Sequence, residues 1–354
     1  MRIVVAMSGG VDSSVAAALL AEAGHDVIGL SMQLYDQREG ATGYGSCCSL
    51  EDLHDAGRVA RRLHIPHYIV NFEREFQRTV VSNFVGEYVA GRTPIPCAHC
   101  NSDLKFATLL DRSLAYGAGM VATGHYARVG IDAATGHRVL RRGLDGAKDQ
   151  SYFLFSLTQA QLSRASFPVG DLSKEAVRGV ARRLGLPVAE KPDSQEICFV
   201  PDGNYAAFIE RTTGDLESGG DIVSESGELL GSHGGVHRFT VGQRKGLGLS
   251  AAEPLYVLQL RPAEKTVVVG PRPALERTGL TASEVNWISG VGPAEPIRVA
   301  AQIRHRHQAA PATVRALDNR RASVEFDAPV IAVTPGQAVV FYDRDVVVGG
   351  GWIE

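Results

Sequence analysis

Two groups of residues in this 354-residue chain have types and spacing that suit chemistry: a glycine-serine segment near the N-terminus and a set of separated cysteines. The first reads Ser8-Gly9-Gly10-Val11-Asp12-Ser13-Ser14 and directly follows the apolar run Ile3–Met7. Its glycines allow a tight turn that brings backbone N–H groups close to a phosphate, and its hydroxyls add hydrogen-bond donors. It has neither the Gly-Lys-[Ser/Thr] of a Walker A loop nor the spacing of a dinucleotide fold. We predict a phosphate-binding loop in which Asp12 binds Mg²⁺ or orients the loop.

The cysteines indicate thiol chemistry. Cys97 and Cys100 follow two prolines and precede a helical pattern that we expect to start near Asn101. A helix N-terminus lowers a thiol pKa, and on this prediction Cys100 is the better placed. A structural zinc half-site and a buried inert pair are the alternatives. Cys198 alone would be a buried core thiol, but two separated thiols beside a nucleotide loop suit sulfur transfer, in which one carries a persulfide and the other releases the sulfur by thiol attack. The adjacent Cys47 and Cys48 are read as structural.

The elements that must position these residues alternate between strand and helix up to about residue 190. We expect strands at Ile3–Met7, Val27–Leu30, Tyr68–Val70 and Met120–Thr123, and helices at Ser13–Ala23, Leu50–Leu63, Glu73–Ala90 and Leu104–Tyr116. We expect Ser13 or Ser14 near the N-cap of the first helix. The charges of the second, Glu51-Asp52 and Arg58-Arg61-Arg62, should form a solvated face. Such alternation predicts a parallel sheet with helices on both faces and ligands beyond the carboxyl ends of its strands.

The pattern changes after about Asp202, where short β-type runs separated by turn residues indicate small all-β modules. We predict an α/β protein with three domains: a catalytic domain at 1–200, a small β-rich domain at 201–270 and a C-terminal β-barrel-like domain at 271–354. Arg304-His305-Arg306-His307 is expected within a strand, with Arg304 and Arg306 on one face.

Composition limits the class of protein. The chain has 44% hydrophobic residues, enough for about two cores, and its longest apolar runs fall short of the roughly 20 residues of a membrane helix. We expect a cytoplasmic protein without a membrane span. Five cysteines in a chain of this length do not suit a disulfide scaffold. The 36 basic residues against 39 acidic ones argue against bulk electrostatic binding of nucleic acid.

Several segments, in their order along the chain, resemble the motifs of the tRNA 2-thiouridylase family, and the loop resembles that of the ATP pyrophosphatases, or PP-loop proteins, to which this family belongs. They are Ser8–Ser14, Arg92–Pro94 with Cys100-Asn101 and Lys105-Phe106, Ala122–Arg128, Lys148–Leu154, Asp193–Phe199, Gly242–Gly248 and Val333–Gln337. The resemblance covers nearly the whole chain. It implies an N-terminal domain similar to the adenine nucleotide alpha hydrolases and a C-terminal barrel that binds tRNA.

The resemblance further implies ATP-dependent thiolation at C2 of the wobble uridine, position 34, in the tRNAs for Lys, Glu and Gln. ATP, with Mg²⁺, would adenylate the C2 oxygen, Cys198 would carry the persulfide, and Cys100 would be the catalytic nucleophile. The persulfide would come from a cysteine desulfurase or a sulfur-relay protein, and the enzyme would act as a monomer.

The binding residues follow from the same motif matches. ATP would contact Ala6, Met7, Ser8, Gly9, Gly10, Val11, Asp12, Ser13, Met32 and Gly124. The tRNA would contact Ile95, Pro96, Cys97, His125, Lys148, Asp149, Gln150, Arg304, His305 and Gln337. Residues from Pro271 onward include 9 Lys or Arg and 9 Asp or Glu, so tRNA binding would depend on local patches.

One departure and three alternatives accompany the resemblance. The family segment Thr-Pro-Asn-Pro-Asp, or Thr-Pro-Asn-Pro-Cys, is Thr93-Pro94-Ile95-Pro96-Cys97 here, so Ile95 stands where an Asn could hydrogen-bond the base. If Cys97, Cys100 and Cys198 converge, they could instead hold a [4Fe–4S] cluster with one open iron.

An ATP-dependent amidotransferase would use the loop but not the thiols. A non-catalytic tRNA-binding module would need no intact loop.

Overall fold

The computed structural model describes residues 1–35, 50–193, 197–200, 203–214 and 219–354. Its N-terminal region is built on a five-stranded parallel sheet in the order β3-β2-β1-β4-β7. The strands are β1 (Arg2–Ala6), β2 (Asp26–Gln33), β3 (His67–Asn71), β4 (Met120–Ala122) and β7 (Ala165–Ser166). The predicted strands are confirmed to within a few residues, since each is a short, mostly apolar run.

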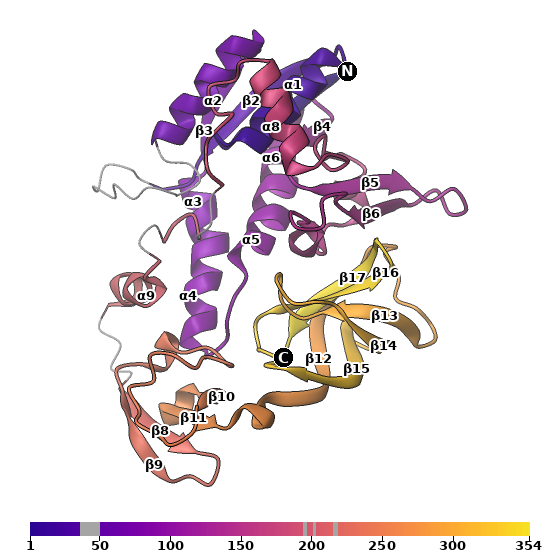
Figure 1. Cartoon of the computed structure of the whole chain (residues 1–354). Helices are drawn as coiled ribbons and strands as arrows, with labels where there is room; N and C mark the ends of the chain where they lie inside the picture. The colour runs from indigo at the N-terminus through magenta and orange to yellow at the C-terminus, as the bar shows by residue number, and fades with distance from the viewer. Residues whose placement is uncertain (36–49, 194–196, 201–202, 215–218) are drawn as a thin grey trace.

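Helices cover both faces of this sheet, as predicted (Figure 1). The central strand β1 divides its side chains by alternation: Ile3 and Val5 lie in one hydrophobic core and Val4 and Ala6 in another. The first core contains residues of α1 (Val11–Glu22), α2 (Leu50–Leu63) and α8 (Lys174–Arg183). The second contains residues of α3 (Glu73–Phe76), α4 (Ser82–Val89), α5 (Pro96–His99) and α6 (Leu109–Ala115).

Two stretches of π-helix join these last helices into longer ones. Residues Gln77–Val81 connect α3 to α4, and Cys100–Thr108 connect α5 to α6. Isolated π-helical turns are uncommon and occur frequently at functional sites. The second of them begins at Cys100.

The start of α1 corrects one prediction. Its N-cap is Gly10, without a side-chain cap, and Ser13 and Ser14 lie inside the first turn, where both hydroxyls donate to the Gly10 carbonyl oxygen. Both serines thus lie near the N-cap, as predicted, but the helix starts at Val11 rather than at Ser13, because Gly10 has the extended backbone that an N-cap requires.

The central region contains α9 (Tyr205–Thr213) and a four-stranded sheet in the order β10-β11-β8-β9. These strands are β8 (Gly220–Ser224), β9 (Leu229–His233), β10 (Tyr256–Arg261) and β11 (Thr266–Gly270). In Figure 1, α4 runs from the parallel sheet toward this smaller sheet.

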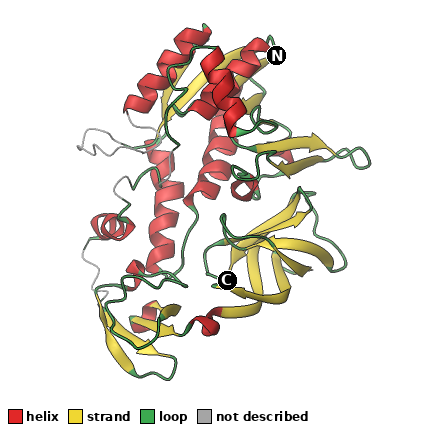
Figure 2. Ribbon diagram, in the orientation of Figure 1, coloured by secondary structure: helices red, strands yellow, loops and turns green. Residues whose placement is uncertain are grey.

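Six strands form a closed barrel at the C-terminus (Figure 2). They are β12 (Glu276–Trp287), β13 (Ile297–Gln302), β14 (Ala310–Leu317), β15 (Arg321–Ile331), β16 (Ala338–Asp343) and β17 (Val346–Ile353), closed by the pairing of β12 with β17. The predicted fold class, a parallel-sheet domain followed by a small β-rich unit and a C-terminal barrel, is confirmed.

A hairpin of the N-terminal region extends the barrel sheet. Strands β5 (Ala127–Ile131) and β6 (Arg138–Arg142) pair with each other, and β6 pairs with β17. The short α7 (Gln159–Leu162) packs beside β6. The barrel is therefore bound by backbone hydrogen bonds to the chain that follows Gly124.

No helix in the described part of the chain has the length and apolar content needed to cross a membrane.

Candidate active site

The glycine-serine segment forms a compact loop between β1 and α1. The Ser8 amide donates to the Ser13 hydroxyl at 3.2 Å, and the Ser8 and Ser13 hydroxyl oxygens are also 3.2 Å apart. Gly9 has a φ of +75°, and a Cβ there would lie 2.2 Å from the backbone oxygen of Asp52 in α2. Only glycine fits this position, so the loop conformation depends on it.

Three of the predicted ATP-binding residues lie at or near the ends of three neighbouring strands. Ala6 ends β1, Met32 lies near the end of β2, and Gly124 follows β4. Gly124 approaches the first turn of α1 so closely that a Cβ on it would lie 2.5 Å from the Ser13 nitrogen. The fold thus gathers these residues at the carboxyl edge of the sheet, where parallel sheets bind ligands.

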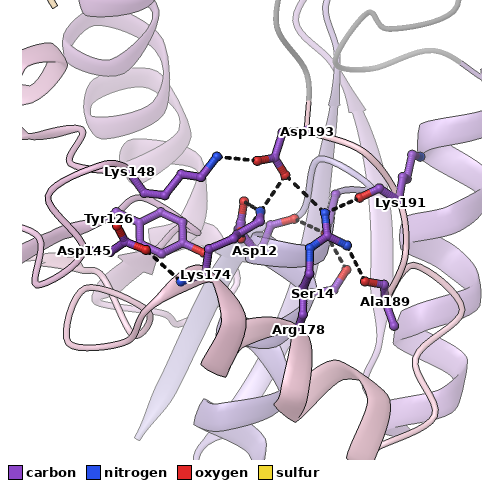
Figure 3. A network of polar contacts seen from close by, with 12 residues as sticks. Asp12, Ser14, Tyr126, Asp145, Lys148, Lys174, Arg178, Ala189, Lys191 and Asp193 are labelled. Carbon is purple, nitrogen blue, oxygen red and sulfur yellow. Dashed lines mark hydrogen bonds and ion pairs between the residues drawn. The ribbon is translucent and has the colours of Figure 1, made fainter. Parts of the chain in front are cut away.

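Asp12 is the first member of a charged network beside the loop (Figure 3). Its carboxylate accepts hydrogen bonds from Lys174 Nζ at 2.8 and 2.9 Å and from the Tyr126 hydroxyl at 2.7 Å. Burial, together with the negative charge of Asp12, raises the pKa of Tyr126, which therefore stays a hydrogen-bond donor. These contacts fix the orientation of Asp12 at the start of α1.

Asp193 is the second carboxylate of this network. It pairs with Lys174 Nζ at 2.6 Å and with Lys148 Nζ at 2.8 Å, and Arg178 lies 3.7 Å away. Burial opposes ionisation of Asp193, but the hydrogen bonds from Lys148 and Lys174 outweigh it and hold its pKa below the ordinary value. Lys174 thus bridges the nucleotide loop to Asp193.

Sequence reasoning missed the roles of Lys174, Arg178 and Tyr126. A helix-start signal was present, because Ser173 caps α8 through a hydrogen bond from the Ala176 amide. Nothing local indicated that the first residue of this helix reaches Asp12, which is 162 positions earlier in the chain.

The helix that carries two of the cysteines starts earlier than predicted. Ile95 is its N-cap and Pro96 its first residue, so Cys97 lies in the first turn and Cys100 one turn inside. Because the effect of the helix dipole is confined to the first turn, the prediction that Cys100 is the better placed for it was wrong.

The three thiols differ in exposure. Cys97 is exposed, Cys100 is buried, and Cys198 is half-buried. Cys100 belongs to the larger hydrophobic core of the N-terminal region, and Cys198 packs against that same core. The predicted nucleophile and the predicted persulfide carrier therefore share one apolar environment. Cys47 and Cys48 lie outside the described residues.

Contacts with the barrel hold the helix of Cys100 in place. The ring of His99 stacks on Trp352 of β17, with centroids 4.6 Å apart and planes 4° apart, and His99 Nδ1 lies 3.1 Å from Asp103. Asn101 donates to the Phe153 carbonyl oxygen at 3.1 Å and accepts from Lys105 Nζ at 3.0 Å. The position of Cys100 thus depends on the barrel as well as on its own domain.

The segment 93–97, which contains the predicted tRNA contacts Ile95, Pro96 and Cys97, is held against the barrel. Gln337 Nε2 donates to the Thr93 carbonyl oxygen at 2.9 Å, and the Thr93 amide donates to the Pro335 carbonyl oxygen at 2.8 Å. The side chains of Ile95 and Pro96 are buried, and Ile95 packs in the hydrophobic core. Of the three predicted tRNA contacts in this segment, only Cys97 has an exposed side chain.

Asp149 and Gln150, also predicted to contact tRNA, use their side chains within the protein. The buried Asp149 carboxylate accepts from Arg142 at 2.7 Å and from the Gly143 amide at 3.0 Å. Gln150 Oε1 accepts from the Tyr126 amide at 3.0 Å. These contacts fix the turn between β6 and the following helical segment, while Lys148 extends from it toward Asp193.

The Arg304–His307 segment is a turn, so the strand predicted there was wrong. Strand β13 ends at Gln302, whose amide donates to the carbonyl oxygens of Arg304 and His305 and closes the turn. His305 packs over Phe153, with centroids 4.5 Å apart, and its Nε2 lies 3.2 Å from the Asp149 carbonyl oxygen. The hydrogen bonds from the Gln302 side chain to these backbone carbonyl groups therefore favour a turn over a continued strand.

His125 provides a pH-dependent prediction. Its Nδ1 lies 2.7 Å from the Thr123 hydroxyl, and burial, followed by the charge of Lys105, lowers its pKa well below the ordinary value. The folded chain keeps this ring neutral where the unfolded chain binds a proton, so its contribution to stability is complete above the unfolded pKa and is lost as the pH falls. We expect the free energy of unfolding, from urea titrations, to decrease between about pH 7 and about pH 5.

The His125→Gln variant should show a shallower decrease over the same range. A residual slope should remain, because burial also lowers the pKa of His67. An unchanged slope in the variant would show that His125 does not contribute to the pH dependence.

The fold and the loop define the class of protein first. The model of the tRNA methyl transferase HUP domain matches residues 1–202, that of the tRNA methyl transferase PRC-barrel domain matches 206–271, and that of the aminomethyltransferase beta-barrel domain matches 277–353. The chain thus consists of three domains: an α/β domain of the HUP type, a PRC-barrel domain and a C-terminal β-barrel domain.

Full-length relatives then define the family. The tRNA-specific 2-thiouridylase MnmA of Solibacter usitatus is 55% identical, covering 99% of both chains, and that of Geotalea uraniireducens is 54% identical, covering 100% of this chain and 95% of the relative. The chain belongs to the tRNA-specific 2-thiouridylase family. A solved 4-thiouridine synthetase–RNA complex with bound ATP is similar over 60% of this chain and 50% of that chain, at 16% identity and a TM-score of 0.35.

Proposed function

We propose that this protein is a tRNA-uridine 2-sulfurtransferase that uses ATP to convert the wobble uridine, position 34, of the tRNAs for Lys, Glu and Gln to 2-thiouridine. One observation carries the proposal. In a member of the 2-thiouridylase family, one domain combines the glycine-serine loop with two thiols, Cys100 and Cys198, that pack on the same hydrophobic core. An amidotransferase would leave both thiols without a role.

In the first step, the C2 oxygen of uridine attacks the α-phosphorus of ATP and pyrophosphate leaves. The backbone amides of the Gly9–Gly10 turn and the N-terminus of α1 favour the phosphate charge. Gly124, directly after β4, lets the end of this strand lie close against the start of α1, beside the loop. The uridine must leave its stack to reach this edge.

Mg²⁺ fits the site through one protein carboxylate and the nucleotide phosphates, which is its usual mode of binding. Asp12 is the carboxylate at the loop, where the hydrogen bonds from Lys174 and Tyr126 hold it in place. When bound, Mg²⁺ supplies charge neutralisation on the phosphates.

In the second step, a persulfide on Cys198, received from a cysteine desulfurase or a sulfur-relay protein, supplies the sulfur. The Cys100 thiolate attacks the Cys198 sulfur, which forms a Cys100–Cys198 disulfide and releases hydrosulfide. Hydrosulfide adds at C2, and AMP leaves with the former C2 oxygen. A dithiol reductant then restores both thiols for the next turnover.

The three thiols do not fit a [4Fe–4S] cluster in this arrangement. Within the described parts of the chain, no three His, Cys, Asp or Glu side chains converge in the way a metal site needs. We therefore derive no step through a cluster and assign Cys97 no catalytic role.

The tRNA would lie across the parallel-sheet domain and the barrel, since the predicted contacts come from both. Lys148, His125 and Arg304 are the polar candidates, and Cys97 marks the exposed side of the nucleophile helix. We propose a monomeric enzyme of the cytoplasm, where tRNA and reducing thiols are both present.

Nucleoside mass spectrometry tests the proposal directly. Unmodified tRNA for Lys, Glu and Gln is incubated with the protein, ATP, Mg²⁺, cysteine and a cysteine desulfurase, and the digested nucleosides are analysed. We expect 2-thiouridine at position 34, with AMP and pyrophosphate formed in equal amounts. A non-hydrolysable α,β-methylene ATP is the matched control and should give none. Absence of 2-thiouridine from the complete mixture would overturn the proposal.

A further inference from the structure

One motif of the sequence, Gly242–Gly248, has no part in the proposed chemistry. It lies between β9 and β10, and the short helical turn that precedes it, Val236–Arg238, packs against α4. Residues 229–252 include three Lys or Arg, namely Arg238, Arg244 and Lys245, and no Asp or Glu. This stretch is therefore locally positive in a chain whose acidic residues outnumber its basic ones.

The conformation of this loop is fixed from within. Gln243 Oε1 accepts from the Thr240 amide at 3.0 Å, and Gln243 Nε2 donates to the Lys245 carbonyl oxygen at 2.9 Å. On the two sides of this turn, the side chains of Val241 and Leu247 are buried in separate hydrophobic cores. The backbone at the tip of the loop is thus held in place before any ligand binds.

The tip presents two cations to solvent. Arg244 and Lys245 are exposed, and among the residues that the structure describes no hydrogen bond or ion pair engages either side chain. Arg238, the third cation of the stretch, is paired with Glu210. Because Gln243 already fixes the backbone, binding of an anion at the tip needs to order only two side chains, which keeps its entropic cost low.

The loop adjoins the chain that leads into the helix of Cys100. The hydroxyl groups of Thr93 and Thr240 form a hydrogen bond of 3.4 Å, and Thr93 lies three residues before Pro96, the first residue of α5. The chain from Thr93 to the exposed Cys97 spans at most about 14 Å. A few nucleotides of an RNA strand cover such a distance.

The exposed start of the helix of Cys100 carries no strong cation of its own. Residues 93–100 contain no Lys or Arg, and Arg92 is paired with Glu87, which accepts from its Nε at 2.6 Å. A uridine that leaves its stack to react here brings the phosphates of its flanking nucleotides with it, and phosphates are held chiefly by Lys and Arg. Arg244 and Lys245 supply this charge from the neighbouring domain.

We propose that Arg244 and Lys245, at the tip of the loop between β9 and β10, form a phosphate-binding site for the RNA strand next to the target uridine. The two cations contact the RNA backbone, so they fix the position of the strand and do not read its sequence. The central domain is thereby a third part of the RNA interface, besides the parallel-sheet domain and the barrel. This inference rests on the proposed function, because it takes the tRNA of that function as the ligand.

The salt dependence of tRNA binding tests this site. The affinity for unmodified tRNA for Glu is measured without ATP between about 50 and about 200 mM salt. The proteins are the wild type, Arg244→Ala and Lys245→Ala. We expect each substitution to weaken binding by about tenfold at about 100 mM salt and to reduce the slope of log K against log salt concentration by about 1. The affinity for ATP, measured in parallel, should stay as in the wild type.

Arg244→Lys separates phosphate binding from a structural role of the loop. It keeps the charge and should keep the slope of the wild type. Wild-type slopes in both alanine variants would overturn the inference, whether or not the affinity falls. The inference would also be overturned if the alanine variants bound tRNA normally but accepted persulfide from the cysteine desulfurase more slowly, because the loop would then be a protein-docking site.

Arg61→Ala is the matched control. Arg61 is an exposed cation of α2, which packs on the opposite face of the parallel sheet from Cys100. It belongs to the solvated face predicted for this helix, a prediction that is wrong at the buried Asp52, which pairs with Lys191 at 2.6 Å. The variant removes the same charge and should keep the wild-type slope.

The binding assay involves no chemistry, so its outcome is independent of thiolation. If the wild type binds tRNA, the alanine variants show the reduced slope and no 2-thiouridine is formed, the proposed function fails and this inference holds. A wild type that does not bind tRNA would overturn both.

Discussion

Replacing Cys198 by alanine will abolish 2-thiouridine formation while tRNA-dependent release of pyrophosphate from ATP continues. The thiol is the proposed carrier of the persulfide, and no methyl group can take its place, so we expect thiolation to fall by about 1,000-fold or more. In the proposed mechanism, adenylation uses the loop and Asp12, which the substitution does not touch. Cys198 is half-buried and packs at the edge of the core, so the fold should remain. Parallel assays of nucleosides and of pyrophosphate check both halves of this prediction.

Cys100→Ser should also stop thiolation, but at a different point. The persulfide should still accumulate on Cys198, because the nucleophile that releases its sulfur is missing. Intact-protein mass spectrometry after treatment with the desulfurase, in the absence of a reductant, should therefore show one additional sulfur atom. Thiolation by this variant at the wild-type rate would exclude Cys100 as the nucleophile.

Cys97→Ala is the control that the chain itself offers. It lies one helical turn before Cys100, and its side chain is exposed. If Cys198 and Cys100 transfer the sulfur as persulfide and nucleophile, this variant keeps its activity. Loss of activity together with loss of bound iron would instead support the three-thiol cluster and contradict the persulfide route.

The parts of the fold that could be predicted from sequence are those with a local signal. The strands around Ile3–Met7 and Met120–Thr123 are short apolar runs, and the helix at Leu50–Leu63 has a strong amphipathic period, so each appears where it was expected. The tight turn of the glycine-serine loop could be predicted because its conformation depends on adjacent glycines, whose effect on the backbone is local.

What could not be predicted depends on partners far away in the chain. Asp52 looks like a solvent-facing helix residue until Lys191, 139 positions later, folds over it. Strand β6 lies in an N-terminal region but joins the C-terminal barrel through β17. Lys174 shows nothing in its neighbourhood that indicates Asp12. In each case the tertiary contact, and not a local pattern, decides the role of the residue.

Replacing Gly124 by alanine will weaken ATP binding and destabilise the protein together. The new Cβ would lie 2.5 Å from the Ser13 nitrogen and 2.6 Å from the Asp12 carbonyl carbon. Both are backbone atoms at the start of α1, and they cannot move without displacing the loop from β4. We expect the free energy of unfolding to fall by about 2 kcal/mol and the affinity for ATP to fall by about 100-fold, the change that misplacement of a binding loop by about an ångström produces.

Gly179→Ala, a substitution in the neighbouring helix α8, should stabilise the protein instead. This glycine lies inside α8, the helix that carries Lys174, and a Cβ there would meet no atom within 4 Å. Alanine should therefore stabilise the protein by about 0.5–1 kcal/mol, because glycine inside a helix loses more backbone freedom on folding. ATP affinity should stay as in the wild type. Urea unfolding and equilibrium nucleotide binding, measured on both variants, separate the two effects. If Gly124→Ala bound ATP as tightly as Gly179→Ala, the close approach of β4 to the loop would have no part in forming the nucleotide site.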